Sequence, residues 1–443
     1  MLALLPAVLC LSLGPKAPAT SAPEVDLAAQ VSAILLRAEE PDAEQTRAAL
    51  AELASLGPLA DPLLALLADW RTPDGAEEEG AALNEAQQAL VLELVAALPR
   101  ATWKPFLDGL ARSEDPGALR AGLRLQGALV KASSLRTLFD LAARASQAGR
   151  FEAVAPAFEQ GLATALARDA KCVDVLRSAW RELDTPRLEC ALRALERRPS
   201  PEVVDCLWSW LGRCASLDAS VLLALGNLHA LVPPARRAAL ANDVQGYLAS
   251  GRSEVIQAAA TTLGRIGAPA TVPWLIELLV HEDRAVQRAA LGALRSIGGM
   301  RLPGSTTAWR SWYAREETWF QEHAPALLEE LVGAEESADP VPQTGALLRS
   351  LTEHRLHRDE LAEHIFPLLS SPRPRQRVLA CQAFERLASR RALPWLVSAL
   401  SDEIPGVVSA AHAALQTLEG VTLGTEPEAW CERLGLPVPV ARP

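Results

Sequence analysis

The stretch EVIQAAATTLGRIGAPATVPWLIELLVHEDRAVQRAALGALRSIGGMRLPGSTTAW, residues 254–309, decides the fold because the chain contains it twice. Moved by 121 positions without a gap, it aligns with residues 375–430, and 16 of the 56 positions are identical. A duplication of this length indicates a repeat architecture. The identical positions in the first copy are Ala259, Arg265, Pro273, Trp274, Leu275, Leu279, Glu282, Val286, Ala289, Ala290, Ala293, Leu294, Gly299, Leu302, Ala308 and Trp309.

Each copy has the pattern of paired helices. Apolar residues recur with a helical period from Val255 to Ile266, and Gly267 fits the left-handed position just past a helix end. Pro273 suits the first turn of a second helix. Residues 286–298 then repeat the apolar pattern of the first helix. The sequence therefore predicts short antiparallel helices that stack on one another.

Both copies go on to a Gly turn, a Leu and a helix led by Ala-Trp. We expect Leu302 and Trp309, like Leu423 and Trp430, to close the open end of each helical pair, because the last apolar face of a solenoid has no neighbour. The other duplicated tryptophans, Trp274 and Trp395, are expected to be structural as well.

These helices resemble the HEAT-repeat family, in particular the short form also found in phycobilisome lyases, over residues 252–299 and 373–419. One departure is that the Arg usual after the first-helix Val is absent after Val255, where Ile256 and Gln257 stand. The resemblance implies an all-α fold, a curved right-handed α-solenoid of about ten HEAT-like helical pairs whose concave face holds a partner.

The composition agrees with an all-α scaffold. The 443 residues are rich in Ala and Leu, and only 5% are aromatic. The formal charge of −11 argues against nucleic acid as the main partner, since phosphate binding needs Lys and Arg. Seven cysteines occur without a CxxC pair, so we expect buried structural thiols rather than a zinc site, although six would remain to pair in an exported protein.

The Pro, Gly and Ser residues that separate the predicted helices indicate how the chain is organised. Residues 1–23 form a signal peptide or disordered leader, 24–250 divergent helical repeats, 251–330 a HEAT module with a closing Trp helix, 331–344 an exposed acidic and Pro-rich linker, and 345–443 a second such module. Within the repeats, helices are expected near 117–131 and 134–148, and a further pair is split at Pro199-Ser200-Pro201.

The N-terminus indicates export. The apolar run Leu2–Leu13 has the length of a signal-peptide core, and Ala17-Pro18-Ala19 offers small residues for cleavage, although no Lys or Arg precedes the run. We expect a periplasmic or cell-envelope protein, with the cytoplasm as the alternative if the leader is not cleaved. No other stretch predicts a transmembrane segment.

The strongest candidate for a binding site is an aromatic stripe on a helix predicted over 306–323. Trp309 is explained by the duplication, whereas Trp312, Tyr313, Trp319 and Phe320 share its broad face and are the partner-binding candidates. The second copy has Arg433 and Leu434 in place of Trp312 and Tyr313. These rings either pack against the next unit or form an exposed contact for a peptide or glycan.

A second candidate is a histidine cluster. On one helix, His357, Glu360 and His364 would share a face and form a plausible zinc or iron set, but a helix break near 354–358 would scatter them, so a solvated charged face is the favoured explanation. The His281-Glu282 dyad invites comparison with deoxyhypusine hydroxylase, yet it stands alone and in a turn, so no iron ligands carry over. No cofactor is predicted.

No catalytic motif occurs: GxSxG, a P-loop and HExxH are all missing from the sequence. Small basic clusters at Arg236-Arg237, 371–377 and Arg390-Arg391 are interpreted as solvated helix starts. The sequence therefore predicts a non-catalytic scaffold for protein–protein interaction. Alternatives are a lyase-like or chaperone-like factor that presents a prosthetic group to a partner protein, and a structural element of the cell envelope.

Overall fold

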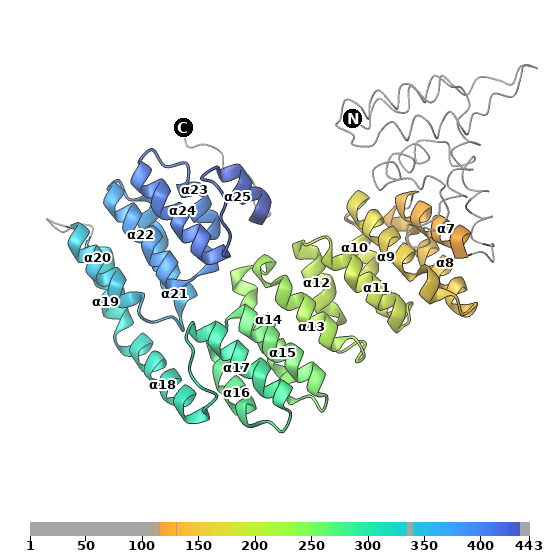
Figure 1. The fold of residues 1–443 in the computed structure, drawn as a ribbon, viewed down its shortest axis with the longest axis horizontal. Coiled ribbons are helices and arrows are strands. Elements are labelled where there is room, and N and C mark those ends of the chain that lie inside the picture. Colours follow the sequence, from red (N-terminus) through yellow and green to blue (C-terminus); the bar gives the residue numbers. More distant parts are fainter. Residues whose placement is uncertain (1–106, 108–111, 113–115, 130, 335–339, 435–443) are drawn as a thin grey trace, which may run out of the picture. The chain divides into compact units, whose positions relative to one another are not determined.

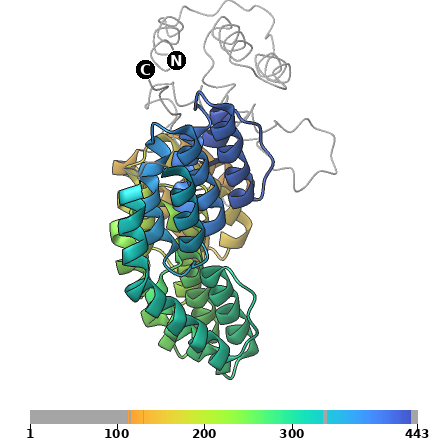
Figure 2. The same ribbon diagram turned by 90° about the vertical axis from the view of Figure 1, so that its left-hand side faces the viewer.

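The computed structural model describes residues 107, 112, 116–129, 131–334 and 340–434. These residues contain nineteen α-helices, α7 to α25, and no strand, which confirms the all-α prediction (Figure 1, Figure 2). They divide into two compact units, one ending at Leu231 and one beginning at Val232. The leader expected at residues 1–23 lies outside the described residues, and the total number of helical pairs stays a prediction.

The helices of the first unit are separated where Pro, Gly and Ser residues predicted breaks. Asp184 and Ser200 accept hydrogen bonds from the backbone N–H groups of Arg187 and Val203, so each caps a helix that begins with Pro in its first turn. The helices are α7 (Pro116–Leu129), α8 (Arg136–Gln147), α9 (Phe151–Arg168), α10 (Cys172–Leu176), α11 (Thr185–Glu196), α12 (Pro201–Trp210) and α13 (Asp218–Asn227).

Alternate helices of the first unit lie side by side, α7 against α9 and α9 against α11. Glycine allows the closest of these approaches: a Cβ added to Gly127 would lie 2.2 Å from the carbonyl oxygen of Gly161. A helix that contacts its second neighbour along the chain is the packing expected of a solenoid.

The second unit contains both copies of the duplicated stretch. Its helices are α14 (Pro234–Gly246), α15 (Ser253–Ile266), α16 (Val272–Glu277), α17 (Arg284–Gly298), α18 (Thr306–Glu322), α19 (Ala324–Gly333), α20 (Pro340–Leu351), α21 (Arg358–Ile365), α22 (Pro374–Leu387), α23 (Leu393–Ala399), α24 (Pro405–Glu419) and α25 (Pro427–Leu434). Helix α15 packs against α17, and α22 packs against α24 in the same way (Figure 1).

The duplication extends to details of backbone and hydrogen bonding. Helices α17 and α24 both end at a left-handed glycine, Gly299 with φ 64° and Gly420 with φ 66°. Trp309 and Trp430 are fully buried. Their indole N–H groups donate to equivalent carbonyls, those of Pro303 at 2.9 Å and Gly424 at 2.8 Å. The predicted closing element therefore exists in both copies.

The structure corrects the linker predicted at 331–344. Residues up to Gly333 belong to α19, and α20 begins at Pro340; residues 335–339 lie outside the described residues. Leu331 and Thr344 are buried, and Leu331 joins the core of the second module. The boundary expected at residue 250 also differs, because α14 packs against α15 and the second unit starts at Val232.

The cysteines behave as core residues. Among the described residues none forms a disulfide, and only Cys214 of the six is partly exposed. Burial raises the pKa of Cys172 to about 11 and those of Cys206 and Cys381 to about 12, so these thiols stay protonated and unreactive at neutral pH.

In the part of the chain that the structure describes, no helix has both the length and the apolar character needed to cross a bilayer.

Candidate functional site

The aromatic stripe of α18 is divided between two packing roles. Trp312 is only 2% exposed and packs edge-to-face on Trp309, with ring centroids 5.4 Å apart. Its indole also rests on the end of α17, where a Cβ on Gly298 would lie 3.1 Å from the ring. Of the two alternatives for these rings, Trp312 therefore shows the packed one and not the exposed patch. Gly298 leaves room for its ring, whereas in the second copy Glu419 stands in place of Gly298 and Arg433 in place of Trp312.

Trp319 and Phe320 join the stripe to the histidine cluster, a contact that the sequence did not predict. Trp319 stacks on His354 and Phe320 on His357, with centroids 3.6 and 3.8 Å apart and nearly parallel planes. Both aromatic rings also pack against the core of the second module. Tyr313 is half-buried beside Glu317. Burial raises the pKa of the Tyr313 hydroxyl most, and the Glu317 carboxylate raises it further. The stripe thus connects the two modules rather than facing solvent as a whole.

Carboxylates hold the two histidines. Atom Nδ1 of His354 lies 3.2 Å from Glu316, and His357 contacts Glu317 at 3.0 Å through Nε2 and Glu360 at 3.2 Å through Nδ1. Burial disfavours the charged form of His357, but Glu360 and Glu317 outweigh burial and raise its pKa.

The proposed metal set is not assembled. His357 and Glu360 meet, whereas His364 is exposed further along α21 and no contact joins it to them. Among the described residues, no group of three or more His, Cys, Asp or Glu side chains could hold a metal ion. The reason is that α21 begins only at Arg358, so His357 precedes the helix instead of sharing its face.

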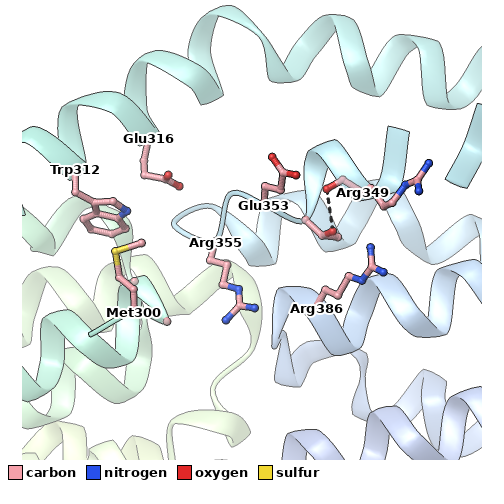
Figure 3. Close-up of a pocket in the computed structure, with 10 residues that line it drawn as sticks. Met300, Trp312, Glu316, Arg349, Glu353, Arg355 and Arg386 are labelled. Carbon is pink, nitrogen blue, oxygen red and sulfur yellow. Dashed lines mark hydrogen bonds between the residues drawn. The ribbon is translucent and has the colours of Figure 1, made fainter. Parts of the chain in front are cut away.

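A cavity of about 490 Å³ opens next to this joint (Figure 3). Its walls come from the end of α17, from α18, from the C-terminal part of α20 with the following loop, and from α22. The residues that line it are Gly298, Gly299, Met300, Trp312, Glu316, Arg349, Thr352, Glu353, Arg355 and Arg386.

A second, smaller cavity of about 390 Å³ adjoins the first. The two share Arg349, Thr352 and Arg386, so they form one continuous groove between α20 and α22. The remaining wall of the second cavity is mainly apolar, with Val341, Pro342, Gly345, Leu348, Leu379, Gln382 and Ala383.

The duplicated tryptophans of α16 and α23 are exposed, which corrects the expectation that they are structural. Trp274 is 54% and Trp395 47% exposed, although each occupies the same position of its copy. Trp395 retains one packing contact, with Phe366, at a centroid distance of 5.4 Å. The helices turn these positions outward because Leu275 and Ile276, and likewise Leu396 and Val397, take the inner face.

The basic clusters are engaged inside the protein. Arg377 binds both oxygens of Asp402, at 2.7 and 2.8 Å, while Arg390 pairs with Glu419 and Arg391 with Glu363. Arg237 lies 3.8 Å from Asp359. These ion pairs balance the charge of Arg377, Arg390 and Arg391, so these side chains are paired within the protein rather than simply solvated at helix starts, as the sequence suggested.

Sequence reasoning missed the arginines of the cavity. Arg349 was not singled out by any motif, Arg355 lies inside the histidine cluster between His354 and His357, and only the duplication singled out Arg386, the counterpart of Arg265. The exposed Trp274 and Trp395 were noticed as a pair but assigned to the interior, because a helical period alone does not show how wide the buried face is.

Comparison with known proteins supports the helical-repeat class. Residues 244–318 match the family model of HEAT repeats, so this segment is similar to HEAT repeats. No curated protein matches the sequence.

Solved structures of the karyopherin Kap121p are similar to this chain. The form bound to Nup53p is 12% identical, with a TM-score of 0.41 over 98% of this chain and 50% of the other. The form bound to RanGTP is 13% identical, with a TM-score of 0.41 over 94% and 46%. The chain therefore spans about half the length of these proteins.

Proposed function

We propose that this chain is a non-catalytic helical-repeat scaffold that binds a protein partner, with Trp274 and Trp395 as contact residues. The observation that carries the proposal is the exposure of the same tryptophan in both copies. Only 16 of 56 positions are shared, and most of the shared apolar residues are buried; the two tryptophans are the only large apolar side chains of the shared set that are exposed.

Physical chemistry favours a binding role for such residues. A Trp side chain that becomes fully covered buries roughly 150–250 Å² of surface, and Trp is enriched among the residues that dominate the binding energy of protein interfaces. Single exposed apolar residues are ordinary, but here both copies of a duplicated module leave about half of the same large ring in water, where it adds nothing to the module's own core. Burial of both rings against a bound partner explains why both copies of the module keep an exposed Trp.

The stacked repeats supply the rigid support that such contacts need. The HEAT-like repeats at residues 244–318 include Trp274, and the second module repeats their helix pattern around Trp395. A partner bound on the concave face and a location in the cell envelope belong to the same proposal, the latter because of the apolar run at residues 2–13. Sequencing the mature N-terminus tests the location separately.

The binding role is tested by affinity purification of the full chain, followed by mass spectrometry. The variant carries Trp274→Ala and Trp395→Ala together. The matched control carries Val280→Ala and Val332→Ala, which remove side chains that are 71% and 70% exposed but are not part of the shared set. Thermal unfolding of all three proteins shows that each is folded.

We expect one protein to be recovered with the wild type and with the valine control, and to be lost with the tryptophan variant. Equal recovery from all three proteins would contradict the proposal, as would repeated recovery of the chain alone.

A further inference from the structure

The larger cavity is lined by three arginines that form no ion pair within the described residues. Arg349 lies on α20, Arg355 on the loop after it and Arg386 on α22, and all three line the cavity (Figure 3). Within the described residues none of their guanidinium groups forms an ion pair or a side-chain hydrogen bond, in contrast to Arg377, Arg390 and Arg391. Like charges that gather without a partner attract an anion.

A buried donor in the same cavity also lacks a partner. The indole Nε1 of Trp312 is buried and has no acceptor among the described residues, although the ring is only 2% exposed. Figure 3 shows this nitrogen on the side of the ring that faces Arg355. A buried N–H without an acceptor is unfavourable, so an acceptor atom placed in the cavity would be stabilised by it.

The two carboxylates of the cavity limit the charge of a ligand. Glu316 is held by His354, and Glu353 is exposed at the rim. Three guanidinium groups against two carboxylates leave one positive charge. This balance suits a carboxylate with a single negative charge better than a phosphate with nearly two, and the planar fork of Arg matches a carboxylate.

The adjoining cavity defines what the carboxylate is attached to. Beyond Arg349, Thr352 and Arg386 the groove continues over the apolar side chains of Leu348 and Leu379. A ligand that reaches both cavities needs an acidic group and an apolar group a few bonds apart, as in a peptide where Asp or Glu stands next to Leu.

We propose that the groove between α20 and α22 binds an acidic peptide segment, with a carboxylate between Arg349 and Arg386, which lie together in Figure 3, and an adjacent apolar side chain over Leu348 and Leu379. A backbone carbonyl of the same segment, further along the cavity toward α18, accepts the indole N–H of Trp312. The site uses none of the residues assigned to partner contact above, and it stands whether or not Trp274 and Trp395 bind a protein.

The Trp312 indole N–H reports directly on this site. The full chain is labelled with ¹⁵N-tryptophan, and Trp312→Phe identifies the resonance in a two-dimensional proton–nitrogen spectrum. The probe is the capped peptide acetyl-Leu-Asp-Leu-amide, titrated to about 10 mM. Acetyl-Leu-Asn-Leu-amide and inorganic phosphate are titrated in parallel, because the first lacks the charge and the second lacks the apolar groups.

Two variants complete the test. The pair Arg349→Gln and Arg386→Gln removes cations that are exposed at the cavity, and Arg265→Gln is the matched control because it changes the duplicated counterpart of Arg386 away from the cavity. We expect the Asp peptide to move the Trp312 resonance to saturation, and the double variant to weaken this binding about tenfold or more. The Arg265→Gln protein should respond like the wild type.

Three outcomes would overturn the proposal. An equal response to the Asn peptide would show that charge is not recognised. Phosphate that binds more tightly than the Asp peptide would assign the arginines to a different anion. A Trp312 resonance that does not move up to about 10 mM peptide would show that the cavity does not receive the peptide segment.

Discussion

Ala388 is the only residue other than glycine with a positive φ among those that the structure describes. It occupies the left-handed region with φ 53° at the end of α22, where the first copy has Gly267 with φ 75°. A side chain with a Cβ is strained there by roughly 1 kcal/mol. The second copy has kept the geometry of the helix end without the residue that suits it.

We expect Ala388→Gly to raise the free energy of unfolding by about 1 kcal/mol, because it removes this strain. Gly267→Ala should lower it by a similar amount. Urea denaturation of the full chain measures both changes. A stabilising Gly267→Ala or a destabilising Ala388→Gly would show that the two helix ends are not equivalent.

His357 gives the joint between the modules a pH dependence. Burial opposes its protonation, but Glu360 and Glu317 raise its pKa above the usual 6.5. A raised pKa stabilises the folded state fully below pH 6.5, and the contribution is lost as the pH rises through the folded pKa.

Melting temperatures of the wild type and of His357→Gln, measured across this window, isolate the effect from other titrating groups. We expect the difference between the two proteins to be largest at acidic pH and to shrink as the pH rises from about 6.5 upwards. A difference that stays constant, or that grows with pH, would mean that the carboxylates do not favour protonated His357.

At the scale of the element, local patterns predicted the helices well. The helical period, the Pro and Gly punctuation and the gapless duplication placed α15 to α18 and α22 to α25, including the closing helices. The predictions that were wrong or missing concern contacts between elements. The stacking of Trp319 and Phe320 on histidines, the outward turn of Trp274 and the cavity beside Trp312 arise where helices distant in sequence meet, and no local period records such contacts.

The closing helices should carry a large share of the stability of their modules. Trp309 and Trp430 are fully buried, and each donates a hydrogen bond to a loop carbonyl. We expect Trp309→Ala and Trp430→Ala each to lower the free energy of unfolding by about 3–5 kcal/mol. Denaturant midpoints measure the loss.

Trp274→Ala serves as the comparison for these two variants, because it removes a ring of the same size from an exposed position. We expect it to lower the free energy of unfolding by less than about 1 kcal/mol. A comparable loss from Trp274→Ala would place that ring in the core of its module and remove the basis for its proposed contact.

At the scale of the molecule, the second unit combines three features: a duplicated core, a joint of aromatic and histidine rings, and tryptophans that stay in water. The first two account for rigidity, since buried closing helices and the Arg358 guanidinium, which donates to the carbonyls of Ser296 and Ile297 at 2.8 Å, fix the ends of helices. The exposed part of these tryptophans is not used in packing within the unit, and it is the feature on which the proposed scaffold function rests.

Site-specific photocrosslinking tests that function most directly. The photoreactive residue p-benzoylphenylalanine replaces Trp274 or Trp395 in the full chain, and Gln321, exposed on α18, provides the control position. Irradiation of the producing cells should give an adduct with the same protein from positions 274 and 395 and none from 321. The absence of an adduct from both tryptophan positions, or an equal adduct from position 321, would contradict the account.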